Sequence, residues 1–198
     1  LVTPRSSVGQ DSQAARPDPR RFKDEIARFT DWDLHNSFPR DAVLFVGSSS
    51  IRFWNTHEAF PDLPVINRGF GGSHVSDVNH FFDQVVTPYH ARVIVFYAGD
   101  NDIAAEVSPE RVRDDFVDFL ERALKVNPKT PVVYLTIKPS GSRWQLWPQM
   151  QRANELIHKL TERYPNLRCV DVGTPLLGPD AKPRDELFRE DRLHLNAE

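Results

Sequence analysis

Two groups of polar residues in this sequence could together carry out nucleophilic catalysis. The stretch AVLFVGSSSIRFWN, residues 42–55, passes from five apolar residues into Gly47 and three consecutive serines. A serine hydroxyl attacks carbonyl carbon when a histidine lies within hydrogen-bond reach and a carboxylate orients that histidine. Asp191 and His194, three residues apart near the end of the sequence, could supply that pair. A structural interpretation competes, because serines after a strand commonly cap the next helix.

Strands and helices of an α/β sheet would have to position these residues. Five short apolar runs predict strands at 42–46, 64–67, 92–97, 131–137 and 168–172. These runs are continuous, which is typical of strands buried on both faces of a parallel sheet. Apolar residues at helical spacing predict helices at about 19–36, 108–127 and 146–164. The alternation predicts a three-layer α/β/α sandwich, doubly wound and flavodoxin-like, around a five-stranded parallel sheet.

Length, composition and charge limit the domain organisation and the partners. The chain has 198 residues, of which 39% are hydrophobic, and a net charge of -3. This predicts one globular domain, and the scattered basic residues argue against nucleic acid as a partner. No apolar stretch reaches the ~20 residues that a membrane-spanning helix needs. Residues 1–20 predict a flexible leader, which leaves 21–198 as the single domain.

The cellular compartment stays open at this point. The sequence begins with Leu1 and lacks the basic-then-apolar pattern of a secretory signal, which favours a cytoplasmic location. A processed N-terminus would equally fit a secreted or periplasmic protein. Cys169 stands alone in an apolar run, so we expect a buried core residue and no disulfide within the chain. A homo-oligomer is compatible with these observations.

Polar residues follow the predicted strands at their carboxyl ends, where ligands bind in such sheets. Residues 48–50 follow the first strand, 69–72 the second and 99–102 the third, while 191–194 come after the last. Each segment by itself is commonly a turn or a helix cap. Their joint occurrence at successive strand ends favours an active site.

These segments resemble the conserved blocks of the SGNH hydrolases, the GDSL-type esterase and lipase superfamily, from about residue 40 onward. The resemblance places Ser49 at the nucleophile position of the block formed by residues 47–51. Ser48 replaces the usual aspartate of that block, which removes a supporting carboxylate. Asp191 and His194 match the Asp-x-x-His block, so the resemblance implies an orienting acid and a general base.

The same resemblance implies an oxyanion hole and a reaction. Gly72 matches the glycine of the second block, with Gly71 as a close competitor, and Asn101 matches the asparagine of Gly-x-Asn-Asp. With the N–H of Ser49, these groups would stabilise a negative oxygen. The implied reaction is carboxylic ester hydrolysis through an acyl-enzyme, without a metal or an organic cofactor. Its partner would be a small-molecule ester.

Residues near these blocks are candidates for the substrate pocket. Ser48, Gly71 and His74 lie beside the proposed machinery, and Arg143 and Trp144 follow the fourth predicted strand. Packing alone would explain the tryptophan equally well. Because no long insertion could form a lid, we expect small acyl groups, in short-chain, aryl or acetylated-carbohydrate esters.

Two other functions fit some of these residues. A metal-dependent phosphoesterase would use Asp100, Asn101, Asp102, Asp191 and His194, whose side chains are ligand types for hard metals. An SGNH-like module that binds carbohydrate without catalysis is the second alternative. Against this module, every catalytic position of the resembled family is filled.

The end of the sequence leads to one further expectation. The chain stops four residues after His194, where the resembled family continues into a final helix that packs on the sheet. We therefore expect a domain without this helix. We also expect residues 188–198 to be among the least stable parts of the molecule, with fast amide hydrogen exchange.

Overall fold

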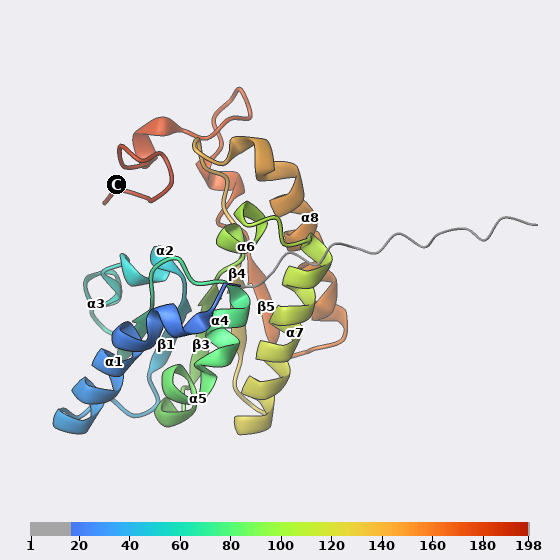
Figure 1. Ribbon diagram of the computed structural model, residues 1–198. Helices are drawn as coiled ribbons and strands as arrows, with labels where there is room; N and C mark the ends of the chain where they lie inside the picture. The colour runs from blue at the N-terminus through green and yellow to red at the C-terminus, as the bar shows by residue number, and fades with distance from the viewer. Residues whose placement is uncertain (1–16, 198) are drawn as a thin grey trace, which may run out of the picture.

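A computed structural model describes residues 17–197 and contains one five-stranded sheet (Figure 1). Most of the predicted leader, residues 1–20, lies outside the described residues. The strands are β1 (Val43–Gly47), β2 (Val65–Gly69), β3 (Val93–Tyr97), β4 (Val132–Leu135) and β5 (Leu167–Val170). All neighbouring strands are parallel, in the order β2-β1-β3-β4-β5, which is the flavodoxin-like order. The predicted α/β fold is therefore confirmed.

The strand register aligns the segments that carry the candidate site. Gly47, the last residue of β1, is paired with Gly69 at the end of β2 and with Tyr97 at the end of β3. The residues after these three strands consequently leave the sheet at one edge. This edge is where the polar residues after each strand can meet.

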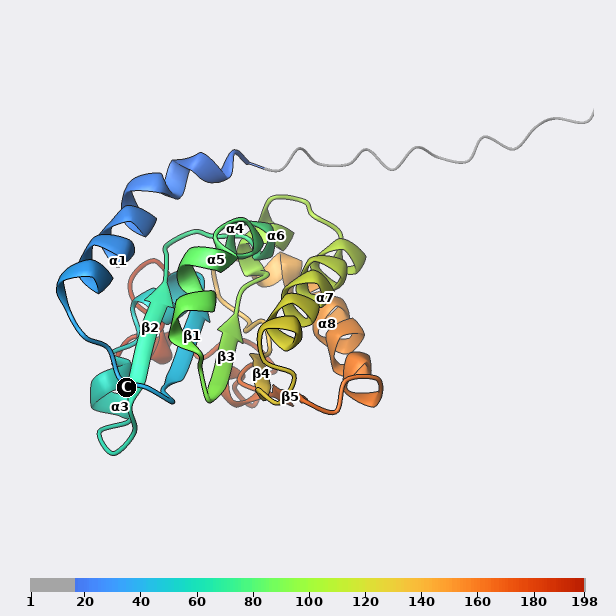
Figure 2. The ribbon, with the colours of Figure 1, turned by 90° about the horizontal axis from the view of Figure 1, so that it is seen from below.

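Five helices cover one face of the sheet and form the main core with it (Figures 1 and 2). They are α1 (Lys23–His35), α4 (Val75–His80), α5 (Phe82–Val85), α7 (Pro109–Val126) and α8 (Trp147–His158). In α7 the Ser108 hydroxyl caps the first turn by accepting a hydrogen bond from the N–H of Arg111. Phe116 and Leu120 lie on its core side and are fully buried, as their helical spacing predicts, and Phe119 is buried as well.

The opposite face has a much thinner outer layer. It is covered by the short helices α2 (Ser49–Arg52) and α3 (Thr56–Ala59), which contact the sheet through Ile51 and Phe60. The three layers of the sandwich are thus unequal. A further short α-helix, α6 (Asp100–Ala104), follows β3. Short 3-10 helices complete the described fold: η1 (Pro19–Phe22), η2 (Thr87–Tyr89), η3 (Trp144–Leu146), η4 (Lys159–Glu162), η5 (Thr174–Leu176) and η6 (Asp185–Leu187).

The single cysteine, Cys169, is less buried than the sequence predicts. Cys169 lies in β5, and it is half-buried against the main core instead of fully buried. Burial raises the pKa of its thiol to about 11.

Within residues 17–197, no helix combines the length and the apolar character that crossing a membrane requires.

Candidate active site

A tight turn from β1 into α2 presents Ser49 at the edge of the sheet. Gly47 has a φ of +140°, and a Cβ at this position would lie 1.9 Å from the carbonyl oxygen of Tyr97. Only glycine fits such a turn. The N–H of Ser48 donates to the same Tyr97 oxygen at 2.9 Å, which holds the turn against β3. Ser49 follows as the half-buried first residue of α2.

His194 joins Ser49 to Asp191 through two hydrogen bonds. The Nε2 atom of His194 lies 2.8 Å from Ser49 Oγ, and its Nδ1 atom lies 2.6 Å from Asp191 Oδ2. The structure therefore brings all three predicted residues into one hydrogen-bonded chain. This is the geometry in which an imidazole can take the serine proton while a carboxylate fixes its orientation.

The Asp191 carboxylate is stabilised by hydrogen bonds and not by burial. Its side chain is 47% exposed, and its Oδ1 atom accepts the backbone N–H groups of Leu193 and His194, each at 2.9 Å. The hydrogen bonds from the His194 ring and from these two N–H groups hold the pKa of Asp191 well below its usual range. Asp191 is consequently an ionised acceptor at neutral pH.

Phe53 supports the imidazole from the side of α2, and sequence reasoning missed it. Its ring meets the His194 ring edge to face, with 5.0 Å between ring centroids and an interplanar angle of 86°. The Arg189 guanidinium lies over the same phenyl ring, 4.8 Å from its centroid. The quoted run Ile-Arg-Phe-Trp placed Phe53 near the serines, but no spacing rule links it to residue 194.

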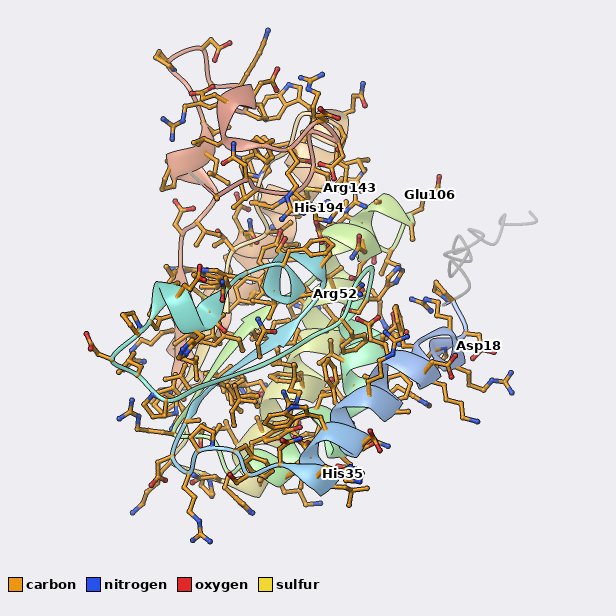
Figure 3. All side chains as sticks on the ribbon, turned by 90° about the vertical axis from the view of Figure 1, so that its left-hand side faces the viewer. Asp18, His35, Arg52, Glu106, Arg143 and His194 are labelled. Atoms are coloured by element: carbon orange, nitrogen blue, oxygen red, sulfur yellow. The ribbon has the colours of Figure 1, made fainter. Side chains whose placement is uncertain are left out.

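Asn101 has a fixed side-chain amide at the amino end of α6. Its Nδ2 atom donates to the carbonyl oxygen of Ser73 at 3.1 Å, and its Oδ1 atom accepts from Arg143 Nη2 at 3.0 Å. Arg143 Nη1 also lies 3.2 Å from Asp100 Oδ2. Figure 3 shows Arg143 and His194 at the same edge of the fold, above Arg52. Arg143 therefore orients the amide that the sequence predicts to face the oxyanion.

Gly72 lies next to Ser73, on the loop that Asn101 contacts. It has a φ of +77°, a conformation that favours glycine, and nothing lies within 4 Å of where its Cβ would stand. Its backbone therefore borders open space. At Gly71, by contrast, a Cβ would lie 2.7 Å from Arg52 Nη1. The geometry is compatible with the prediction that Gly72 is the oxyanion glycine.

Two predicted pocket residues, Ser48 and His74, are buried. Ser48 has no exposed surface, because the turn between β1 and α2 encloses it. His74 is 6% exposed at the start of α4, and its Nδ1 atom lies 3.9 Å from Asp102 Oδ1. Burial lowers the pKa of His74, which favours its neutral form. Neither residue lines the open groove of about 560 Å³ described below.

Trp144 is placed by stacking within the segment after β4. Its ring stacks on that of Trp147, with centroids 6.4 Å apart and an interplanar angle of 18°. Trp147 in turn packs against the main core. The structure thus gives these tryptophans a packing role, and a substrate contact by Trp144 stays a prediction.

The carboxylates proposed for a metal have other partners. Asp102 is 1% exposed and accepts the N–H of Val75. Its burial raises the pKa of its carboxyl well above the usual value, which favours the protonated form. Asp100 faces Arg143, and Asp191 faces His194. In residues 17–197, no three His, Cys, Asp or Glu side chains are grouped so that they could hold a metal ion.

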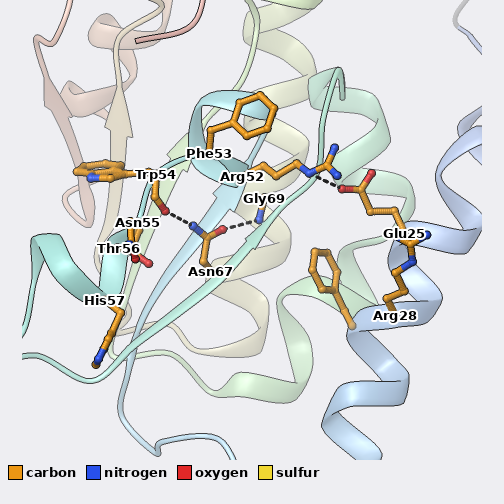
Figure 4. A pocket seen from close by; sticks show the side chains of 11 residues that line it. Glu25, Arg28, Arg52, Phe53, Trp54, Asn55, Thr56, His57, Asn67 and Gly69 are labelled. Atoms are coloured by element: carbon orange, nitrogen blue, oxygen red, sulfur yellow. Dashed lines mark hydrogen bonds and ion pairs between the residues drawn. The ribbon is translucent and has the colours of Figure 1, made fainter. Parts of the chain in front are cut away.

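An open groove of about 560 Å³ borders the candidate site (Figure 4). It lies between α1 and the residues after α2, and Arg52 and Phe53 form its boundary with the site. Arg52 pairs with Glu25 of α1 at 3.1 Å. On its floor, Asn67 donates to the carbonyl oxygens of Ile51 and Trp54 and so holds the carboxyl end of α2 on β2.

Comparison with known proteins relates both the sequence and the fold to hydrolases. The family model described as the GDSL-like Lipase/Acylhydrolase family matches residues 47–198. This range contains Ser49, Gly72, Asn101, Asp191 and His194. No curated protein matches the sequence significantly.

Solved structures share the fold at low sequence identity. A protein from Streptococcus pneumonia, provisionally described as a platelet activating factor, has a TM-score of 0.79 at 20% identity, covering 89% of this chain and 86% of its own. A GDSL-like lipase from Bacteroides thetaiotaomicron has a TM-score of 0.69 at 19% identity, covering 91% and 90%. The acetyl xylan esterase AlAXEase has a TM-score of 0.65 at 20% identity, covering 78% and 91%. At these identities the similarity establishes the fold alone.

Proposed function

The chain belongs to the GDSL-like lipase/acylhydrolase family, and on that premise we propose that it is a serine esterase that hydrolyses carboxylic esters with small acyl groups. The observation that carries the proposal is the 2.8 Å hydrogen bond between Ser49 Oγ and His194 Nε2. A serine hydroxyl is a poor nucleophile unless such a base takes its proton.

The first step forms the acyl-enzyme. As Ser49 Oγ bonds to the ester carbonyl carbon, its proton passes to His194 Nε2, and the carbonyl oxygen takes up the negative charge. Asp191, 2.6 Å from His194 Nδ1, stabilises the resulting imidazolium. When the tetrahedral intermediate collapses, the bond to the alcohol oxygen breaks, and His194 returns the proton to that oxygen.

The negative oxygen would be stabilised by the N–H groups of Ser49 and Gly72 and by the Asn101 amide. The hydrogen bonds from Arg143 and to Ser73 hold that amide in one orientation before substrate binds. Loss of one such donor typically costs roughly 10²- to 10³-fold in turnover. Water then attacks the acyl carbon while His194 takes its proton; the bond to Ser49 Oγ breaks, His194 returns the proton to that oxygen, and the carboxylic acid leaves. None of these steps requires a metal or an organic cofactor.

Small acyl groups are the proposed substrate class, in short-chain, aryl or acetylated-carbohydrate esters. The open space beside Gly72 and the open groove beside Phe53 provide room for a bulky alcohol part of the ester. The similarity in fold to AlAXEase, an acetyl xylan esterase, makes acetylated xylan a sensible test compound. A panel of nitrophenyl esters from acetyl to palmitoyl, run beside acetylated xylan, measures this preference.

Ser49→Ala tests the proposed function directly. We expect nearly complete loss of nitrophenyl acetate hydrolysis with unchanged circular dichroism and melting, because the hydroxyl carries the covalent step. Ser50→Ala is the matched control, since Ser50 is the next residue of the same helix and is also half-buried. A sulfonyl fluoride should modify the peptide that contains Ser49.

Three results would contradict the proposal. Activity retained in Ser49→Ala would move the nucleophile elsewhere, and so would a sulfonyl fluoride adduct on another peptide. Activity lost to a chelator and restored by added metal would favour the phosphoesterase alternative.

A further inference from the structure

Lys138 is a buried lysine that contacts the loop carrying His194. It lies beyond the carboxyl end of β4 and is 3% exposed. Its Nζ atom donates a hydrogen bond to the carbonyl oxygen of Leu193 at 2.6 Å. The ammonium also lies over the Phe188 ring, 5.6 Å from the ring centroid. The side chain therefore extends from the sheet to Phe188 and Leu193, which are the two ends of the loop that precedes His194.

An ammonium in this position needs an explanation, because removing a charge from water is costly. Burial lowers the pKa of Lys138, while the nearby charges of Asp100 and Asp191 favour its protonated form. An apolar side chain of similar length would fill the same space without this cost. The hydrogen bond to Leu193 is what the lysine adds.

This hydrogen bond acts on the peptide unit that immediately precedes the His194 side chain. The carbonyl oxygen of the Leu193–His194 peptide accepts from Lys138, and its N–H donates to Asp191 Oδ1 at 2.9 Å. A peptide unit is planar and rigid, so contacts on both of its sides fix its position and tilt. The Cα atom of His194 belongs to this unit and is fixed with it.

The remaining attachments lie at the base of the loop, where the N–H of Arg189 donates to the carbonyl oxygen of His194 at 2.8 Å, or at Arg192. Phe188 and Leu195 form a β-bridge that closes the loop, and Ser142 donates to the carbonyl oxygen of Arg192 at 3.1 Å through its N–H. Ser142 and Arg192 are both exposed. Lys138 supplies the buried attachment at the residue next to His194.

We propose that Lys138 is a positioning residue, which holds the Leu193–His194 peptide so that His194 Nε2 stays within hydrogen-bond reach of Ser49 Oγ. The inference rests on the proposed esterase function. Lys138 does not touch the reacting atoms and acts through the backbone of the base. Its effect should therefore fall on turnover and not on substrate binding.

Variants of Lys138 test this role with nitrophenyl acetate as substrate. Lys138→Met keeps the length and removes the donor, and we expect kcat to fall roughly 10- to 100-fold, because small misplacements of a catalytic group cost that much. Lys138→Gln keeps a donor but reaches about one bond less far, so an intermediate kcat is expected. KM should stay within about twofold in both. Lys129→Met is the matched control, since it removes the same charge from an exposed site before β4.

Two further measurements separate positioning from folding. Active sites are counted by the burst of nitrophenol, so that kcat refers to folded enzyme only. The proton shared by His194 and Asp191 is followed by its low-field NMR signal, which should shift or broaden in Lys138→Met and stay unchanged in Lys129→Met. If Lys138→Met does not fold, Lys138→Gln carries the same test, with a reduced kcat and a shifted signal.

A wild-type kcat per active site in any folded Lys138 variant would overturn the proposal. So would an unchanged low-field signal beside a reduced kcat, because the base would then be in place. Failure of the proposed function is a separate result, since it would appear as hydrolysis by the wild-type enzyme that does not depend on Ser49.

Discussion

At the scale of single residues, the candidate site depends on hydrogen bonds more than on burial. Asp191 is nearly half exposed, yet it accepts hydrogen bonds from the His194 ring and from two backbone N–H groups. His194 is the better shielded partner, with a side chain 19% exposed between Ser49 and Phe53. The orientation of the imidazole is thus set by short contacts that a single substitution can remove.

Asp191→Asn should lower kcat by roughly 10³- to 10⁴-fold and leave the fold intact. The amide that replaces the carboxylate can offer its NH₂ group to His194 Nδ1. The tautomer with its proton on Nε2 is then favoured, and this tautomer cannot accept the Ser49 proton. Glu190→Gln is the control, because Glu190 is the exposed neighbour of Asp191. Steady-state kinetics with nitrophenyl acetate measure this loss of kcat. Activity near that of the control would mean that another group orients the ring.

The sequence could predict only part of the candidate site at this scale. Ser49, Asp191 and His194 follow from short motifs and meet in the structure as those motifs predict. Lys138 could not be found in this way, because it lies outside the motifs and its contact with Leu193 joins residues 55 positions apart. The burial of His74 could not be found either, because its place near the glycines says nothing of how exposed its side chain is.

At the scale of elements, short helices hold the candidate site together through their first residues. The Asp102 carboxylate of α6 accepts the N–H of Val75, the first residue of α4. This contact ties the segment after β3 to the segment after β2. Because Asp102 is 1% exposed, its charged form is strongly disfavoured in the folded protein.

Asp102→Asn should change how stability depends on pH. The folded-state pKa of Asp102 lies well above 3.8, so between these values the folded protein binds a proton that the unfolded chain releases. Folding stability must therefore fall as pH rises through this window. Asparagine cannot ionise, so the melting temperature of the variant should rise relative to that of the wild type as pH increases from about 4, the usual pKa of an aspartate. Thermal unfolding measures this difference, and a constant or shrinking difference would mean that folded Asp102 is ionised.

The regular elements were easier to predict from the sequence than the short ones. Strands have continuous apolar runs and long helices have periodic apolar residues, and α7 (Pro109–Val126) falls within the 108–127 that its pattern predicts. Helices α2, α3 and α5 have four residues each, which is too short for a periodic pattern. Tertiary contacts determine where such short helices form and end. At the end of α2, for example, Asn67 donates a hydrogen bond to the carbonyl oxygen of Ile51.

At the scale of the whole molecule, the sheet and the segment that carries His194 differ in how they are held. The central strands β1 and β3 have a neighbour on each side, and their inward residues are buried in the main core. In Figure 1 the C-terminal segment lies beyond the sheet, at the end where the strands finish. Its hydrogen bonds are mostly local, such as those from Arg189 to His194 and from Asn196 to Leu187.

Hydrogen exchange should reveal two levels of stability. We expect amides in residues 188–196 to exchange by local opening, and faster than amides of β3, which open only when the core unfolds. The attachments through Lys138 and Ser142 should make this exchange slower in the folded protein than in an unstructured peptide of the same sequence. Exchange monitored by mass spectrometry measures both rates, and protection equal to that of β3 would show that the segment opens only with the whole domain.

The hydrogen bond between Ser49 and His194 also has a consequence for biosynthesis. It joins residues 145 positions apart, and chains grow from the N-terminus at roughly 5–20 residues per second. Under the proposed mechanism, Ser49 leaves the ribosome on the order of ten seconds before its base has been made. A nascent chain that ends before His194 therefore carries an unactivated hydroxyl. Under this mechanism, hydrolysis can begin only after translation has passed His194 and the loop has closed, so the growing chain is inactive until then.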